Sequence, residues 1–327
     1  MLAKNIIYKI RKKYDIHSMF KNTRRYFSNN NNEGSMLHGL SEGTIYGRKN
    51  GEIVDVSDLS ENCEIELLLS PTPNGHKISI LLEELNMEYK VRCIDLSGEQ
   101  YQGDFLTHSP NAKIPVIIDH SNNFSIFESG AILTYLCEKY DKDNKFYFNN
   151  NDTADWINDT DKFKKRSEIM QWLMWQKANL GPMVGQAITF NRFVKQPIET
   201  IQYSIHRYEK ESRRLFEVCD KQIGNKQFIC TDDEPSIADF AIFPWIRAHR
   251  MAKVSIDGLL NIENYLIRMK KRVGVKKGLS VGFVNTPLGR EMGMRYSNDQ
   301  RMTSEQKEAF LEGGSKFLHE KAEELSK

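Results

Sequence analysis

A short apolar segment that turns abruptly into a helix constrains this chain more than any other feature. Residues 65–69 read as a buried strand, and apolar side chains recur at helical spacing over residues 78–85. The turn between them, residues 70–75, places Thr72 and Asn74 beside the first exposed N–H groups of that helix. Because a helix N-terminus attracts negative charge, a hydroxyl and an amide at this point predict an anion-binding site. The alternative interpretation is an ordinary turn capped by Asn74.

The segments that follow predict a small mixed α/β domain. A second strand is expected over residues 89–96, and a β-hairpin over residues 115–127 with its turn at 120–123. An amphipathic helix is expected over residues 129–140. With a short helix before the hairpin, the order is β-α-β-α-β-β-α, which implies a four-stranded mixed sheet with helices packed on its faces.

The second half of the chain is predicted to be all-helical, because residues 162–275 contain no convincing strand. Helices are expected over residues 162–177, 198–223, 240–251 and 262–273. The Ser-x-x-Asp pattern at residues 236–239 predicts a capping box. Gly181 and Pro182 are expected to kink or break the helix that reaches them.

The N-terminal segment differs in composition from the rest of the chain. Residues 1–32 carry eight lysines and arginines but one acid, Asp15, and their apolar residues can share one helical face. A basic, acid-poor, amphipathic leader of this kind resembles a mitochondrial transit peptide. The alternatives are a disordered basic arm and a cytoplasmic protein.

The whole chain therefore divides into five predicted parts. These are a transit peptide at 1–32, a linker or extension at 33–62, the α/β domain at 63–145, the all-helical domain at 155–285 and a C-terminal tail at 286–327.

Composition excludes several classes of protein. A net charge of +2 over 327 residues is too small to indicate a nucleic-acid partner. No apolar run approaches the roughly 18–20 residues that span a bilayer, so no membrane segment is expected. The five cysteines lack C-x-x-C spacing and predict reduced thiols rather than a disulfide framework. Histidine and cysteine show no metal-ligand spacing, so no metal site is expected.

Two further candidate sites fall at strand ends that share one edge of the expected sheet with Thr72. Ile114 and Pro115 open the third strand, and a cis bond there would turn the backbone of Ile114 toward a peptide ligand. Ser129 is a candidate helix N-cap whose hydroxyl suits a carboxylate, and Glu128 suits an ammonium group. Such a pair fits the α-amino acid end of a small peptide. The alternative is an ordinary cap beside an exposed acid.

Three strings together resemble the cytosolic-type glutathione transferases. They are Pro-Thr-Pro-Asn-Gly-His-Lys-Ile at 71–78, Ser-Pro-Asn-Ala-Lys-Ile-Pro at 109–115 and Phe-Glu-Ser-Gly-Ala-Ile-Leu at 127–133. Within that family the chain is most similar to the nu-class branch of glutathione-dependent disulfide-bond oxidoreductases, which is related to the yeast nitrogen-regulator prion protein. The similarity covers roughly residues 63–285.

The resemblance implies a thioredoxin-like N-terminal domain followed by a helical bundle, and a homodimer. It also implies that glutathione, as co-substrate, brings the reactive sulfur, because no cysteine stands at residues 70–75. Thr72 and Asn74 would then act on that sulfur as the catalytic pair. The full implied glutathione site comprises Thr72, Asn74, Gln100, Ile114, Pro115, Glu128, Ser129 and Arg207. Gln100 and Arg207 rest on weaker strings than the others.

Three functions stay open at this point. In the first, bound glutathione thiolate reduces disulfides or mixed disulfides, and a second glutathione resolves the intermediate. In the second, the enzyme conjugates glutathione to small electrophiles that the apolar helical domain holds. In the third, the protein binds glutathione as a regulator without catalysis.

Overall fold

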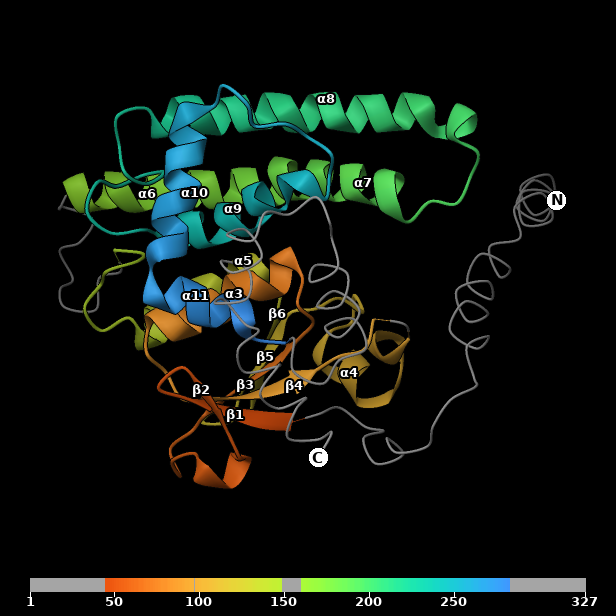
Figure 1. Ribbon diagram of the computed structural model, residues 1–327. Coiled ribbons are helices and arrows are strands. Elements are labelled where there is room, and N and C mark those ends of the chain that lie inside the picture. The colour runs from red at the N-terminus through yellow and green to blue at the C-terminus, as the bar shows by residue number, and fades with distance from the viewer. Residues whose placement is uncertain (1–44, 97, 149–159, 283–327) are drawn as a thin grey trace, which may run out of the picture.

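The computed structural model describes residues 45–96, 98–148 and 160–282, and shows a sheet-and-helix domain below a set of helices (Figure 1). The predicted transit peptide at 1–32 and tail at 286–327 lie outside the described residues. Mitochondrial targeting therefore stays a prediction of the sequence.

The first domain is built on a six-stranded sheet of order β2-β1-β4-β3-β5-β6. Neighbouring strands run antiparallel except β3 and β4, which are parallel. The strands are β1 (Ile45–Lys49), β2 (Glu52–Val54), β3 (Ile65–Leu69), β4 (Tyr89–Cys93), β5 (Val116–Asp119) and β6 (Phe124–Phe127). The four predicted strands are confirmed as β3 to β6.

The segment predicted as a linker or extension, residues 33–62, adds the other two strands. Asn50 and Gly51 form the turn between β1 and β2 with φ angles of 52° and 79°. An Asn-Gly pair with positive φ at both residues is a strong hairpin signal. The prediction of four strands was wrong, because this hairpin adds two strands to the sheet beside β4. A short 3₁₀ turn, η1 (Val56–Asp58), then leads to β3.

Helices cover both faces of the sheet. The longer ones, α3 (Pro73–Glu84) and α5 (Ser129–Tyr140), pack on one face. The short helices η2 (Glu99–Tyr101) and α4 (Gly103–His108) follow β4, and Phe105 of α4 packs with Leu68 and Val116 on the opposite face. Because α3 lies between the sheet and the second domain, its residues 75–83 are all buried.

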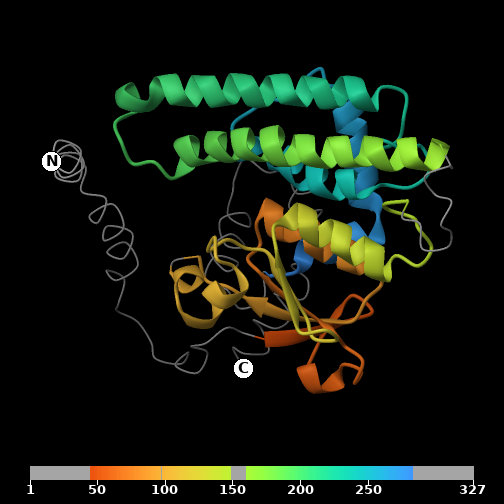
Figure 2. The ribbon, with the colours of Figure 1, turned by 180° about the vertical axis from the view of Figure 1, so that it is seen from behind.

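The second domain is entirely helical in its described residues, as predicted. Its elements are α6 (Thr160–Trp175), η3 (Gln176–Leu180), α7 (Gly181–Arg192), α8 (Ile198–Ile223), α9 (Ile237–Arg247), η4 (Ala248–Arg250), α10 (Leu260–Lys271) and α11 (Val273–Ser280). The predicted capping box is present, with Ser236 N–H donating to Asp239 Oδ2 over 2.8 Å. The helix does not break at Gly181 and Pro182, because α6, η3 and α7 follow one another without a gap and form one continuous helix in Figure 2. The π-helical segment η3 precedes Pro182 and accommodates its missing N–H donor.

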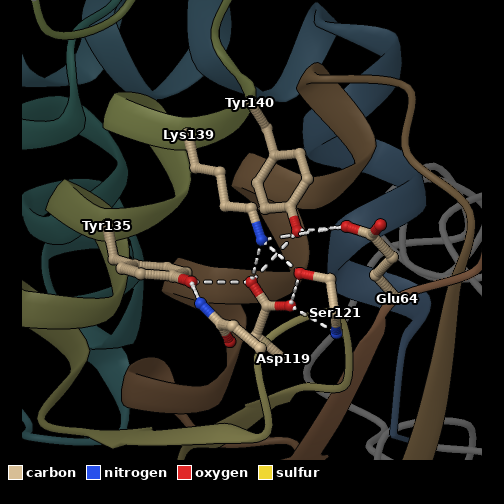
Figure 3. Close-up of polar contacts among 7 residues, drawn as sticks. Glu64, Asp119, Ser121, Tyr135, Lys139 and Tyr140 are labelled. Atoms are coloured by element: carbon tan, nitrogen blue, oxygen red, sulfur yellow. Dashed lines mark hydrogen bonds and ion pairs between the residues drawn. The ribbon is translucent and has the colours of Figure 1, made fainter.

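A buried carboxylate closes the end of the sheet that lies opposite to Thr72. Asp119, whose side chain is 0% exposed, accepts from Lys139 Nζ over 2.6 Å and from the Tyr135 hydroxyl over 2.7 Å (Figure 3). Ser121 and Tyr140 donate to it as well. Burial alone would raise the pKa of Asp119, but the hydrogen bonds from Lys139, Ser121 and Tyr135 lower it below its usual value. The ionised form therefore stabilises the fold.

We expect Asp119→Asn to lower the free energy of unfolding by about 1.5–3 kcal/mol at pH 7, the range for a hydrogen bond to a charged group. A depressed carboxyl pKa contributes stability above the unfolded value of about 3.9 and loses it as the pH falls further. The difference between the wild type and the variant should therefore shrink from pH 5 to pH 2 in urea unfolding. A difference that stays constant over this range would contradict an ionised Asp119.

Candidate active site

The turn that leads into α3 has the geometry of an N-terminal anion site. Thr72 is the N-cap, and its hydroxyl oxygen accepts from Gly75 N–H over 3.2 Å. The alternative prediction of Asn74 as the cap was therefore wrong. A Cβ built on Gly75 would lie 2.3 Å from the carbonyl oxygen of Ser70, so only glycine fits this turn. Thr72 and Asn74 are half-buried, and a ligand can reach them.

Asn74 is oriented from the helical domain. Its Oδ1 accepts a hydrogen bond of 3.1 Å from the indole N–H of Trp245 on α9. Because an indole nitrogen can only donate, it holds the amide oxygen on its own side and leaves the two N–H groups of Asn74 for an acceptor. Gly181 and Gly185 make room for the indole, since a Cβ on Gly185 would lie 3.3 Å from Trp245 Cη2. The sequence analysis missed Trp245, because its helix showed only an apolar pattern.

The sheet brings the three predicted strand-end sites together. The register pairs Leu68 with Val116 and Val116 with Phe127. The C-terminal ends of β3 and β6 and the N-terminal end of β5 therefore lie at one edge. That edge carries the α3 turn, the Ile114–Pro115 peptide bond, which is cis, and the junction that contains Glu128.

The junction between β6 and α5 differs from the prediction in one respect. Glu128, not Ser129, occupies the N-cap position, with φ 70° and ψ 110°. Few non-glycine residues adopt positive φ, and such backbone strain is concentrated at functional sites. Ser129 is the first residue of α5. Its hydroxyl oxygen accepts hydrogen bonds from two lysine side chains and not from a helix N–H group.

Two lysines that the sequence analysis missed complete this junction. Lys177 Nζ lies 2.7 Å from Glu128 Oε2 and 3.2 Å from Ser129 Oγ. Lys77 of α3 is 1% exposed, and its Nζ lies 3.4 Å from Ser129 Oγ and 2.6 Å from Gln176 Oε1. Burial and the charge of Lys177 lower the pKa of Lys77 well below its usual value, while Glu128 raises it.

No hydrogen bond or ion pair among the described residues joins Gln100 or Arg207 to this edge. Gln100 is 6% exposed and donates to the carbonyl oxygen of Leu96 over 3.0 Å. Arg207 is exposed on α8, where the next residue, Tyr208, stacks on Phe190 of α7. Both assignments stay predictions.

The cysteines are unsuited to act as nucleophiles. All five lie in the described residues, none is in a disulfide, and Cys63 alone is more than marginally accessible. Burial raises the pKa of every one of them, and that of Cys93 reaches about 12. Thiols with such pKa values carry little thiolate at neutral pH.

Comparison with known proteins agrees with the resemblance. A family model described as "Glutathione S-transferase, N-terminal domain" matches residues 65–138. The disulfide-bond oxidoreductase YfcG of Escherichia coli is 38% identical over 221 residues, which is 66% of this chain and 94% of that protein. The chain belongs to the glutathione transferase family. The chain is also similar to solved structures of the family.

A glutathione transferase homologue from Lodderomyces elongisporus, solved with two glutathiones per subunit, has a TM-score of 0.59 and 30% identity, covering 67% of this chain and 98% of its own. A glutathione transferase from Pseudomonas putida, solved with one glutathione disulfide per subunit, has a TM-score of 0.57 and 31% identity, covering 69% of this chain and 94% of its own.

The described residues contain neither a helix that could span a membrane nor a cluster of metal-binding side chains. None of their helices combines the length and apolar character that crossing a membrane requires. They also hold no group of three or more histidine, cysteine, aspartate or glutamate side chains placed to bind a metal ion.

Proposed function

We propose that this protein binds glutathione at the edge that carries Thr72, Asn74 and Ser129, and uses the glutathione thiolate to reduce disulfides. One observation carries the proposal. Trp245 holds the oxygen of Asn74, so the amide N–H groups remain as donors at the N-terminus of α3. No cysteine stands there to receive them.

The free energy needed to ionise the glutathione thiol near neutral pH is within reach of the groups at this site. A thiol of pKa 8.5 is about 7% ionised at pH 7.4, and lowering the pKa by two units raises this to about 90%. That shift needs about 2.7 kcal/mol of preferential stabilisation of the thiolate. A helix N-terminus supplies about 0.3–1 kcal/mol and a hydrogen bond to a charged group about 1.5–3 kcal/mol. Donors from Thr72 and Asn74 therefore suffice.

The proposed reaction has two exchange steps. The thiolate of bound glutathione attacks one sulfur of the substrate disulfide, forms a mixed disulfide and releases the other sulfur as a thiolate. The thiolate of a second glutathione then attacks the glutathione sulfur of the mixed disulfide and releases the second substrate thiolate. The two glutathiones leave together as glutathione disulfide. The relatives solved with two glutathiones or with glutathione disulfide are consistent with this sequence.

The parts of glutathione other than its sulfur bind along the same edge of the sheet. The backbone of Ile114 pairs with it in β fashion beside Pro115, and Glu128 and Ser129 receive its α-amino acid end. Gln100 and Arg207 are the remaining predicted contacts of the site.

We also propose that the protein is a homodimer, with the second copy on the face formed by β6, α5 and α6 (Figure 2). Two shallow apolar pockets on this face share Met174. Exposed apolar side chains there include Phe124, Phe163 and Met174. Light scattering should give twice the 38.0 kDa of the chain.

A parallel assay tests the proposed function. With glutathione present, we expect turnover of hydroxyethyl disulfide to exceed turnover of an aryl halide. The reverse order would favour conjugation of glutathione to electrophiles. Tight binding of glutathione without turnover of either substrate would favour a regulatory protein.

A further inference from the structure

The Ser129 hydroxyl is contacted by two lysine side chains from different elements. Lys177 reaches it from η3 over 3.2 Å, and Lys77 reaches it from α3 over 3.4 Å. The same Lys177 Nζ lies 2.7 Å from Glu128 Oε2. Two lysine side chains and one carboxylate therefore meet at the first turn of α5.

The Ser129 hydroxyl has the capacity for a further hydrogen-bond partner. A hydroxyl has one proton to donate and two lone pairs, and a protonated lysine can only donate. Where Lys77 and Lys177 both donate to Ser129 Oγ, they occupy its two lone pairs and leave the Ser129 proton for a third group. No acceptor for it lies among the described residues that hydrogen-bond to Ser129. A carboxylate oxygen would satisfy this donor.

The two lysines differ in how a ligand reaches them. The Lys177 side chain is 27% exposed and that of Glu128 is 48% exposed, whereas Lys77 is 1% exposed. The aliphatic stem of Lys177 crosses Gly130, since a Cβ there would lie 3.5 Å from Lys177 Cγ. A ligand that arrives from solvent therefore meets Lys177 and Ser129 first, with Lys77 behind them.

We propose that Lys177 is a specificity-determining residue that binds the α-carboxylate of the γ-glutamyl group, an inference that rests on the proposed binding of glutathione. The ligand carboxylate lies between Lys177 Nζ and the Ser129 hydroxyl. The ligand ammonium faces the carboxylate of Glu128. Four charges of alternating sign then form a closed ring, which selects peptides that begin with a free α-amino acid.

Calorimetric measurement of glutathione binding to the Lys177→Met variant tests this assignment. We expect glutathione to bind about 5–10-fold more weakly than to the wild type, because a charge-assisted contact is lost. Lys177→Arg should stay within about twofold, since it keeps the charge. Lys164→Met is the matched control, because Lys164 is exposed on α6 and pairs only with Asp161 among the described residues.

The decisive probe is 4-aminobutyryl-cysteinylglycine, which is glutathione without the α-carboxylate. We expect it to bind the wild type and Lys177→Met equally, because the partner of Lys177 is absent. Tighter binding of glutathione to Lys177→Met, or an equal loss for both peptides, would overturn the assignment while leaving the proposed function intact. A wild type that binds neither peptide would instead refute the proposed function, and this inference with it.

Discussion

We expect Asn74→Ala to lower the rate of glutathione-dependent disulfide reduction about 10–100-fold at pH 7, while the affinity for glutathione changes less than about threefold. The rate falls because the thiolate loses a hydrogen bond to a charged group, worth about 1.5–3 kcal/mol. The thiol pKa then moves back toward 8.5, so the rate should recover as the pH is raised from 7 to 9. Steady-state rates over this pH range, with calorimetric binding, measure both effects.

Two further variants test whether the effect depends on the Asn74 amide and on the Trp245 side chain that orients it. Trp245→Phe removes the N–H group that orients Asn74 and should give a smaller loss than Asn74→Ala. Asn122→Ala is the matched control, because Asn122 hydrogen-bonds Tyr135 at the opposite end of the sheet. A variant at Asn74 that loses binding and rate equally, with an unchanged pH profile, would contradict a role in thiolate formation.

We expect Arg48→Met to lower the free energy of unfolding by about 3–5 kcal/mol, the range for breaking a buried ion pair by removing one partner. Arg48 Nε donates to Glu83 Oε1 over 2.8 Å, and both side chains are 3% exposed. The Tyr89 hydroxyl donates to the same oxygen over 2.8 Å. Without the guanidinium, Glu83 would be a buried carboxylate that lacks a cation. Denaturant unfolding of the full chain measures the loss.

Two further variants serve as comparisons for Arg48→Met. Lys49→Met should cost less than about 1 kcal/mol, because Lys49 and its partner Glu88 are 35% and 27% exposed. The double variant Arg48→Met with Glu83→Gln should recover part of the stability, since no buried charge remains unpaired. A loss below about 1 kcal/mol for Arg48→Met would contradict a stabilising role of the buried Arg48–Glu83 ion pair.

Local patterns predicted the parts of the fold that depend on neighbouring residues. Alternating or continuous apolar runs identified β3 to β6, and helical spacing identified α8 with the bounds observed. The strand order then placed the α3 turn, Ile114 and Glu128 at one edge, because the ends of antiparallel neighbours meet there. This placement required only the order of the elements.

Features that depend on tertiary packing could not be predicted in the same way. Lys77 lies in a helix that is buried on every side, which the pattern of a single segment does not indicate. Trp245 contacts Asn74 across 171 residues, and Lys177 reaches Ser129 across 48. The hairpin at Asn50 and Gly51 differs, because its turn signal was present in the sequence.

The central claim is that the reacting sulfur comes from glutathione and not from the chain. Replacing Cys63, Cys93, Cys137, Cys219 and Cys230 together by serine or alanine tests it, with circular dichroism to verify the fold. We predict that the cysteine-free protein reduces hydroxyethyl disulfide with glutathione at a rate within about threefold of the wild type. Loss of that activity from a folded cysteine-free protein would contradict the claim.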